Sequence, residues 1–310
     1  MSLFFLIFLC YNKFMQLSII IVNHNAQKLL EDCLDSIYKN TPKLDFEIIV
    51  IDNNSCDKSL FAIKTNFKEV KLIENRANVG FAKAVNQGMG QAKGQFLLCL
   101  NNDTIVLPSS LNKLSHFMNS HSSVIAAGGK VLNPNGSIQF SCRRFPNYQT
   151  FLFNRHSLLT RIFKNNKFSK NYLMSDWPHN EACAVDWASA CYLIMRREAI
   201  EKVGLMDERF FMYCEDVDWC LRAKKLGFKI YYVPDCPIIH LDKGYGKNFN
   251  RKIIEHHKSM YYFYKKNLRK TLFMDLPVLI FINIRAGFIL LLNYLKLILC
   301  KIKDYPKEMF

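Results

Sequence analysis

The chain has 310 residues, of which 50% are hydrophobic and 22% are charged. This composition excludes a disordered chain, collagen and a coiled coil, and the length suits one large core or two small domains. The 42 lysines and arginines exceed the 26 acidic residues and give a net charge of +16. We therefore expect an anionic partner, which is nucleic acid, an acidic membrane surface or a phosphorylated substrate.

Eleven cysteines are scattered along the chain without a Cys-x-x-Cys pair. This spacing predicts reduced thiols of a cytosolic protein rather than a zinc site. The opening MSLFFLIFLCYNKF holds an apolar run of about ten residues, which is too short to cross a bilayer. We expect residues 1–14 to be an N-terminal extension and Met15 to be the true start, with an interfacial anchor as the alternative.

The first half of the chain alternates apolar runs with amphipathic segments. The runs LSIIIVNHN and EIIVIDNNSCD have the pattern of strands buried in a parallel sheet. Residues 29–38 between them show helical spacing, and Thr41-Pro42 ends that helix. A third unit adds a strand, a glycine-containing loop, a helix and a strand, at 70–73, 78–80, through Asn86, and 95–100. These units predict an open α/β sheet.

Three of these strands end in polar residues. The clusters are Asn23 to Asn25, Asp52 to Asn54, and Asn101 to Asp103. Ligands of parallel sheets bind beyond the carboxyl ends of the strands, and those ends share one edge. The sequence therefore predicts a site at this edge.

The second half of the chain is less regular at first. The stretch from Gly128 to about Ala184 is turn-rich, basic and aromatic, which is typical of a substrate-covering insertion. A regular pattern resumes with a strand at 191–196, an acidic helix start at Glu215-Asp216 and a strand at 229–233 that precedes His240.

The last part of the chain changes in character. Residues 251–270 form a basic helical pattern with interleaved tyrosines, and residues 276–303 are nearly uniformly apolar, broken by Arg285 and Lys296. A lipid-facing arginine is rare in the middle of a membrane span. We therefore predict helices that lie in the interface of an anionic membrane.

Each polar cluster has two interpretations when it stands alone. Asn101 and Asp103 are spaced to face one side of an extended segment and could hold a divalent cation, although such residues also end strands as turn formers. Asp52 could bind a base or ribose, or cap a helix. Asn78, Gly80 and Asn86 could line a nucleotide pocket, but each is unremarkable alone.

The most informative cluster is Glu215-Asp216-x-Asp218 at a helix start. Three carboxylates repel one another unless the helix N-terminus, a cation or a basic substrate offsets them, and a carboxylate beside a sugar hydroxyl is a suitable general base. Trp219 could stack on a sugar or pack against the sheet, and Arg222 could hold Asp216 or a phosphate. His240 fits a metal ligand or a structural histidine equally well.

Taken together, ordered motifs resemble the inverting glycosyltransferases of family 2, with the closest likeness to the rhamnosyltransferase branch of bacterial polysaccharide synthesis. They are LSIIIVNHN, EIIVIDNNSCD, NVGFAKAVNQG, LLCLNNDT, the stretch from VDWASACYLIM to CEDVDWCLRAKKLGF, and YYVPDCPIIH. The resemblance covers about Leu17 to Lys266. It implies a GT-A fold, an α/β fold in which a Rossmann-like nucleotide-binding half joins an acceptor-binding half over a mixed sheet.

The resemblance also implies roles for individual residues. Asp52 would contact the nucleotide, Asp216 would be the catalytic base, and Glu215 would orient the acceptor. Asp103 with Asn101 stands at the metal-binding Asp-x-Asp position, and His240 would be a further ligand of Mg²⁺ or Mn²⁺. The expected nucleotide-sugar-binding residues are Asn23, Asn25, Asp52, Asn54, Asn78, Gly80, Asn86, Asn102 and Asp103. The expected acceptor-binding residues are Trp187, Ser189, Glu215, Trp219 and Arg222.

The sequence departs from the family pattern at two places. Asn101 replaces the first Asp of Asp-x-Asp, and Trp187-Ala188-Ser189-Ala190-Cys191 stands where relatives have Trp-x-Ser-Gly-Ala. The first change removes one carboxylate from the metal site. The second narrows the expected acceptor pocket and leaves the acceptor's identity open.

These observations predict a GT-A domain over 15–245 and a membrane-associated tail over 246–310, peripheral to the cytoplasmic face of the bacterial inner membrane. The predicted reaction is metal-dependent, inverting transfer of a sugar, with rhamnose expected, from a nucleoside-diphosphate sugar to a lipid-linked glycan. A sugar-phosphate nucleotidylyltransferase is the alternative enzyme, but the glycine-rich signature it would show near the first strand is absent. A nucleic-acid-binding protein lacks a recognisable motif here, so we expect no nucleic-acid partner. A pseudoenzyme that binds sugar nucleotide is the remaining alternative.

Overall fold

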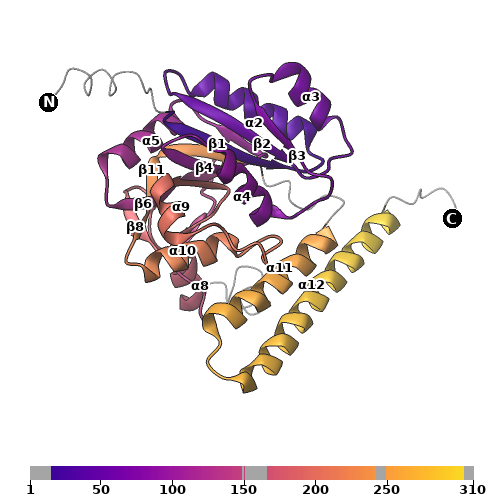
Figure 1. Cartoon of the computed structure of the whole chain (residues 1–310). Coiled ribbons are helices and arrows are strands. Elements are labelled where there is room, and N and C mark those ends of the chain that lie inside the picture. Colours follow the sequence, from indigo (N-terminus) through magenta and orange to yellow (C-terminus); the bar gives the residue numbers. More distant parts are fainter. Residues whose placement is uncertain (1–14, 149, 151–165, 242–248, 304–310) are drawn as a thin grey trace, which may run out of the picture.

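The computed structural model describes residues 15–148, 150, 166–241 and 249–303 (Figure 1). The predicted extension 1–14 lies outside these residues, as does the side chain of Lys296. The strands are β1 (Leu17–Asn23), β2 (Phe46–Asp52), β3 (Lys71–Glu74), β4 (Phe96–Asn101), β5 (Thr104–Val106), β6 (Val124–Leu132), β7 (Cys142–Arg143), β8 (Cys183–Val185), β9 (Trp187–Ala188), β10 (Tyr192–Arg196) and β11 (Lys229–His240). The helices are α2 (Gln27–Asn40), α3 (Ser59–Asn66), α4 (Phe81–Gln91), α5 (Ser110–Ser120), α8 (Lys167–Leu173), α9 (Arg197–Val203), α10 (Glu215–Lys225), α11 (Phe249–Phe263), the π-helix η1 (Tyr264–Leu268), the 3₁₀-helix η2 (Leu272–Met274) and α12 (Asp275–Lys303).

The main sheet has the strand order β3-β2-β1-β4-β10-β6-β11-β5, with β8 on β11. The strands β3, β2, β1 and β4 are parallel, β10 is antiparallel to both of its neighbours, and β6 is parallel to β11. The sheet is therefore mixed, as predicted. Since β10 alone reverses between β4 and β6, its N-terminal end meets the carboxyl ends of β1, β2 and β4 at one edge.

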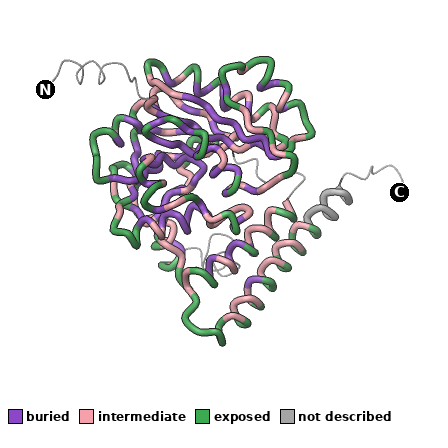
Figure 2. Tube along the Cα trace, in the orientation of Figure 1, coloured by how far each residue is buried: buried purple, intermediate pink, exposed green. Residues whose placement is uncertain are grey.

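The sheet separates two hydrophobic cores. Successive residues of a strand point to opposite faces, so Ile19 and Ile21 pack with α2 and α5, while Ile20 packs with α4, α9 and α10. Figure 2 shows buried residues concentrated in the strands and in the helix faces that cover them. This double coverage explains why the β1 and β2 sequences read as uninterrupted apolar runs.

The prediction that the insertion begins at Gly128 was wrong, because Gly128 to Leu132 form the second half of strand β6. A Cβ on Gly129 would lie 2.1 Å from Cε1 of the buried Tyr192 ring, and one on Gly128 would lie 2.7 Å from the Cβ of Ala188. The two glycines therefore make room for neighbouring side chains within the sheet.

The tail forms an antiparallel helix pair, in which α12 runs beside α11 (Figure 1). Phe263 of α11 belongs to a core of the main sheet, and the Ser259 hydroxyl donates a hydrogen bond to the Met212 carbonyl at 2.8 Å. These contacts join α11 to the sheet domain across the predicted boundary at residue 245. Among the described residues, the helix at Leu272–Leu295 is long and apolar enough to cross a membrane by length and composition.

Candidate functional site

The ends of β1, β2 and β4 are joined by side-chain hydrogen bonds. The Nδ2 atom of Asn23 donates to Asp52 Oδ1 at 3.0 Å, and Asn102 Nδ2 donates to Asn23 Oδ1 at 2.8 Å. Ser55 donates to both oxygens of Asp52, through its hydroxyl at 2.6 Å and its amide at 2.8 Å. Asn23 and Asp52 are 0% and 1% exposed, so this network fixes the floor of the predicted nucleotide site.

Other predicted nucleotide-binding residues shape the loops around this floor. Asn25 and Asn54 adopt positive φ angles of 52° and 63°, and Asn25 Oδ1 accepts a hydrogen bond from the Cys56 amide at 2.6 Å. Asn78 Oδ1 accepts from the Gly80 amide at 3.1 Å. Asn and Gly tolerate these backbone conformations best, and the three asparagines lie in loops around the strand ends.

The three predicted metal ligands do meet, although they lie far apart in the sequence. His240 Nε2 lies 3.0 Å from Asp103 Oδ1 and 3.2 Å from Asn101 Nδ2. His240 Nδ1 lies 2.6 Å from Gln139 Oε1, and Gln139 Nε2 donates to Asn133. The oxygen of Gln139 faces the ring as an acceptor, and in the tautomer that carries the proton on Nδ1 the Nε2 lone pair faces Asp103 and the amide nitrogen of Asn101.

The Nε2 lone pair of His240 and the Oδ1 atom of Asp103 lie 3.0 Å apart, so one cation could bind to both. Carboxylate oxygen and imidazole nitrogen are both metal donors, and a metal-binding histidine is usually held by a hydrogen bond to its other nitrogen. Asp103 and His240 therefore fit a divalent cation, and Gln139 supplies that orienting bond. Gln139 was missed in the sequence because it lies 101 residues from His240 and belongs to no motif.

The Glu215-Asp216 pair begins α10 directly after a strained turn. Tyr213 and Cys214 have φ angles of 71° and 67°, a conformation that costs about 1–3 kcal/mol for each residue. The turn places Asp216 against the start of β10, where Oδ2 accepts from the Ala190 amide at 3.0 Å and Oδ1 from the Val217 amide at 2.8 Å. The carboxylate is thus held at both oxygens.

The surroundings of Glu215 and Asp216 disfavour the ionised form of both carboxylates. Burial raises the pKa of Asp216, although the hydrogen bonds from Ala190 and Val217 and the charge of Arg143 partly offset this. Burial and then the charge of Asp216 raise the pKa of Glu215 well above its ordinary value. The Oε2 atom of Glu215 is buried without a hydrogen-bond partner. A buried polar atom of this kind is typical of a site that receives a ligand.

Asp216 and the end of β4 flank the same short segment. Ala190 binds Asp216 through its amide, and the next residue, Cys191, accepts a hydrogen bond from the Asn101 amide at 3.1 Å. Burial raises the pKa of Cys191 to about 12, and the charges of Asp216 and Asp103 contribute to the rise. Cys191 therefore lies close to both carboxylates.

Some predicted site residues form bonds that stabilise the fold and do not face the site. Trp219 is 0% exposed and its indole donates to the Gly204 carbonyl at 2.9 Å, so the ring presents no face to a sugar and the stacking prediction was wrong. Arg222 binds Asp218 at 3.0 Å rather than Asp216. Asn86 donates to the Met206 carbonyl through Nδ2 and accepts from the Met206 amide through Oδ1. Its side chain therefore holds the loop at Met206 and does not line a nucleotide pocket.

Trp187 and Ser189, two residues expected to bind the acceptor, lie near Asp216 but differ in how exposed they are. Trp187 is 5% exposed, its indole donates to Arg144, and the Arg143 guanidinium lies 5.2 Å from the centre of its ring. Ser189 is half-buried, and its amide donates to Ser141 at 2.8 Å. The charge of Arg143 partly offsets the rise in the pKa of Asp216. In the sequence, Arg143 stands out only as part of a basic patch.

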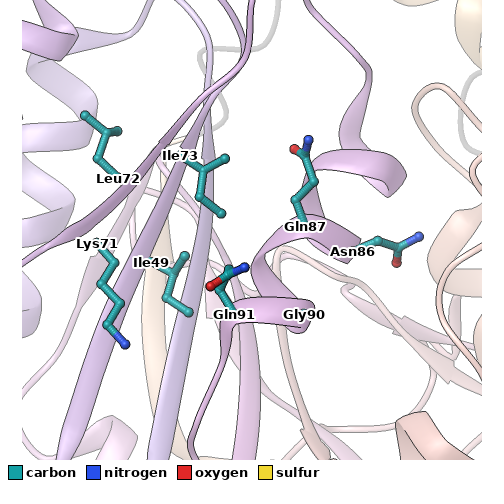
Figure 3. Close-up of a pocket in the computed structure, with 8 residues that line it drawn as sticks. All are labelled: Ile49, Lys71, Leu72, Ile73, Asn86, Gln87, Gly90 and Gln91. Carbon is teal, nitrogen blue, oxygen red and sulfur yellow. The ribbon is translucent and has the colours of Figure 1, made fainter.

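A surface hollow of about 580 Å³ lies between α4 and the strands β2 and β3 (Figure 3). Ile49 and Lys71 line it, and they pair across β2 and β3 three residues before Asp52. Figure 3 shows the Asn86 side chain turned away from these two residues. The hollow contains none of the strand-end carboxylates and is not the candidate site.

Together, the mixed sheet and the acidic strand-end cluster define a GT-A fold built around a nucleotide-binding edge. Residues 18–204, more than half of the chain, match the model of glycosyl transferase family 2, and the chain belongs to this family. The resemblance seen in the sequence is confirmed, and the chain is a glycosyltransferase. This assignment decides against the nucleotidylyltransferase alternative, whereas the absence of a nucleic-acid partner stays a prediction.

Two relatives extend over most of the chain. The N-acetylglucosaminyl-diphospho-decaprenol L-rhamnosyltransferase of Mycobacterium tuberculosis (strain ATCC 25618 / H37Rv) is 28% identical over 260 residues, 80% of this chain and 83% of that protein. Rhamnosyltransferase WbbL of Escherichia coli (strain K12) is 26% identical over 247 residues, 77% of this chain and 88% of that protein.

Solved structures support the fold. Mannosyltransferase PcManGT from Pyrobaculum calidifontis, in complex with GDP-Man and Mn²⁺, has a TM-score of 0.57 at 15% identity and covers 90% of this chain and 79% of its own. GalNAc-T7 with UDP, GalNAc and Mn²⁺ has a TM-score of 0.56 at 21% identity, over 74% of this chain and 44% of its own. At these identities the likeness shows the fold alone, and it confirms the predicted GT-A architecture.

Proposed function

We propose that this glycosyltransferase moves a rhamnosyl residue, with inversion, from a nucleoside-diphosphate sugar to a lipid-linked glycan during surface polysaccharide synthesis. The observation that carries the proposal is the position of Asp216. It is held by the Ala190 amide beside the partnerless Oε2 of Glu215, and it shares the sheet edge with Asp103 and His240. The likeness to two rhamnosyltransferases supports the choice of sugar.

The reaction follows from the properties of Asp216. Its raised pKa makes the carboxylate a stronger base than a free aspartate. Asp216 takes the proton of an acceptor hydroxyl, and the oxygen forms a bond to the anomeric carbon from the side opposite the leaving group. The bond from that carbon to the nucleoside diphosphate breaks, and the diphosphate leaves with the electron pair. Glu215 orients the acceptor through its buried Oε2 atom.

The donor lies across the ends of β1, β2 and β4. Asp52 accepts hydrogen bonds from the base or ribose, and Asn23 and Ser55 hold it in place. A divalent cation such as Mg²⁺ or Mn²⁺, held by Asp103, His240 and Asn101, would neutralise the charge that develops on the diphosphate. The structures solved with Mn²⁺ support this choice of ion.

The acceptor is delivered from an anionic membrane. The outer side of α12 and the turn before it expose large apolar side chains at helical spacing, including Phe273 at 93%, Leu276 at 64% and Ile284 at 67%. We call this surface the apolar ridge. Lys258 on α11 and Arg269 directly after η1 are 66% and 38% exposed in their side chains, and each also pairs with one acidic neighbour, Glu255 and Asp275. An apolar surface with flanking cations suits peripheral binding at the cytoplasmic face of the inner membrane, where such acceptors would be presented.

The test is turnover of a panel of nucleotide sugars by the full chain with Mn²⁺ and a short lipid-diphosphate glycan acceptor. We expect transfer from a deoxythymidine-diphosphate rhamnose donor and a fall in kcat of about 10³-fold or more in Asp216→Asn, with binding of the donor retained. Asp176→Asn, an exposed aspartate near α8, is the matched control. Full activity in Asp216→Asn would remove Asp216 as the base, and preferred turnover of another sugar would replace rhamnose.

A further inference from the structure

Asp218 is a carboxylate of α10 that lies two residues after the base and is 0% exposed. Three donors surround it: Arg222 Nε at 3.0 Å, Lys266 Nζ at 2.8 Å and Asn267 Nδ2 at 3.0 Å. A buried carboxylate is costly unless it is paired and hydrogen-bonded. Arg222 belongs to the same helix, but Lys266 and Asn267 come from η1, at the junction between the sheet domain and the apolar helix α12.

Lys266 also ties this carboxylate to the loop that precedes the base. Its Nζ atom donates to Asp207 Oδ2 at 2.7 Å, and Asp207 accepts further bonds from Arg209 and from the Tyr262 hydroxyl. Burial acts to raise the pKa of Asp207, but the hydrogen bonds from Arg209 and Lys266 outweigh it and hold the pKa well below its usual range. One lysine from the tail therefore bridges two carboxylates on either side of the Glu215-Asp216 turn.

The backbone around this bridge has two unusual features. The turn into α10 carries the positive φ angles of Tyr213 and Cys214, and the Asp218 amide closes the first helical turn onto the Cys214 carbonyl at 2.9 Å. Lys266 and Asn267 lie in a π-helical turn, a rare conformation that is frequent at functional sites. Strained backbone persists only where the surroundings hold it, and the contacts to Asp218 hold this turn at its far end.

We propose that Lys266 and Asn267 are positioning residues of the transferase, which fix Asp218 and thereby hold the first turn of α10 so that Asp216 faces the acceptor hydroxyl. The inference rests on the proposed role of Asp216 as the base. It assigns part of the catalytic geometry to the tail rather than to the strand-end motifs. Their side chains bond Asp207 and Asp218 rather than Asp216.

Four variants test this assignment: Lys266→Met, Lys266→Arg, Asn267→Ala and the control Lys265→Met, which removes the neighbouring exposed lysine. We expect Lys266→Met to lower kcat by about tenfold or more, because small displacements of a catalytic group are costly, while the KM for the donor stays within about twofold. Lys266→Arg keeps the charge and restores most of kcat, and Asn267→Ala, which loses one of three donors, gives a smaller loss.

Hydrogen–deuterium exchange of residues 213–218 provides a readout that needs no substrate. Exchange there rises in Lys266→Met and Asn267→Ala, and it stays at the wild-type level in Lys266→Arg and Lys265→Met. Unchanged exchange in Lys266→Met overturns the proposal, as does a loss of kcat that Lys265→Met shares. If the choice of rhamnose is wrong, the wild type itself fails with that donor, while the exchange comparison still decides the positioning role.

Discussion

The carbonyl oxygen of Phe211 lies 2.5 Å from the point where a Cβ on Gly80 would stand. The Phe81 amide donates to this same carbonyl at 2.6 Å, and Asn53 Nδ2 donates to the Gly80 carbonyl at 3.1 Å. Gly80 therefore joins the nucleotide side of the sheet, through Asn53, to the loop that leads into Glu215 and Asp216. The two halves of the site meet at one residue without a side chain.

Substitution of Gly80 by Ala should destabilise the fold and disturb both halves of the site. Gly80 has φ 88° and ψ 173°, a region that only glycine populates readily, so strain alone costs about 1–3 kcal/mol and the clash with Phe211 adds to it. Chemical denaturation measures this loss. The control is Gly90→Ala in the same helix, where a Cβ meets nothing within 4 Å, and it should stabilise the protein by up to about 1 kcal/mol. Equal changes in the free energy of unfolding for the two variants would contradict the role of Gly80 as the contact between the two halves of the site.

The strand-end residues could be predicted because the topology of a parallel sheet fixes where they go. Each apolar run ends in one of these residues, namely Asn23, Asp52 or Asp103. Parallel strands bring their carboxyl ends to one edge of the sheet, independently of the conformation of the loops. The role of a helical residue depends instead on which side of the helix meets the sheet. The sequence leaves Trp219 free to stack on a sugar or to pack against the sheet, and in the structure its ring packs inward and its indole donates to the Gly204 carbonyl.

Residues whose role depends on a distant partner could not be found from the sequence. The turn-rich, basic and aromatic residues that follow Leu132 predict an insertion from Gly128, whereas Gly128 and Gly129 belong to β6 and pack against Ala188 and Tyr192. Gln139 orients His240, and Lys266 binds Asp218, across 101 and 48 residues. Such pairings arise from tertiary packing and leave no local pattern.

Glu215→Gln should stabilise the protein while it impairs the site. The pKa of Glu215 is raised, so the folded state binds its proton more tightly than the unfolded state does. Glu215 therefore costs little stability below its ordinary value of 4.5, and the cost grows as pH rises from there toward the folded-state pKa. Glutamine removes that cost, so the variant should melt a few degrees above the wild type at pH 8, with a smaller gap at pH 5.

The control for this measurement is Glu198→Gln, which changes an exposed carboxylate on α9. Its melting temperature should match the wild type at both pH values. A gap for Glu215→Gln that narrows as pH rises would contradict the assignment of a buried, destabilised carboxylate. In an activity assay, the same variant should raise the KM for the acceptor more than the KM for the donor.

Gln139→Ala should weaken binding of Mn²⁺ by about 10–100-fold, because outer partners of a metal-binding histidine contribute that much. The substitution removes the acceptor that keeps the proton on Nδ1 of His240 and the lone pair on Nε2. Electron paramagnetic resonance of free Mn²⁺ measures the affinity without turnover. Asn135→Ala, in the exposed turn of the same segment, should leave the affinity unchanged. Wild-type affinity in Gln139→Ala would show that His240 needs no orienting bond.

The apolar ridge should govern binding to membranes. Phe273→Glu with Ile284→Glu places two charges on a surface that meets no other part of the described chain, so the fold should survive while burial in lipid becomes unfavourable. The double variant should lose most of its sedimentation with vesicles of anionic phospholipid, and its activity toward a short water-soluble acceptor should persist. Phe61→Glu, which alters a 69% exposed side chain on α3, should bind vesicles as the wild type does. Undiminished sedimentation of the double variant would assign the ridge to a protein partner, whereas a loss shared by Phe61→Glu would point to a general effect of added negative charge.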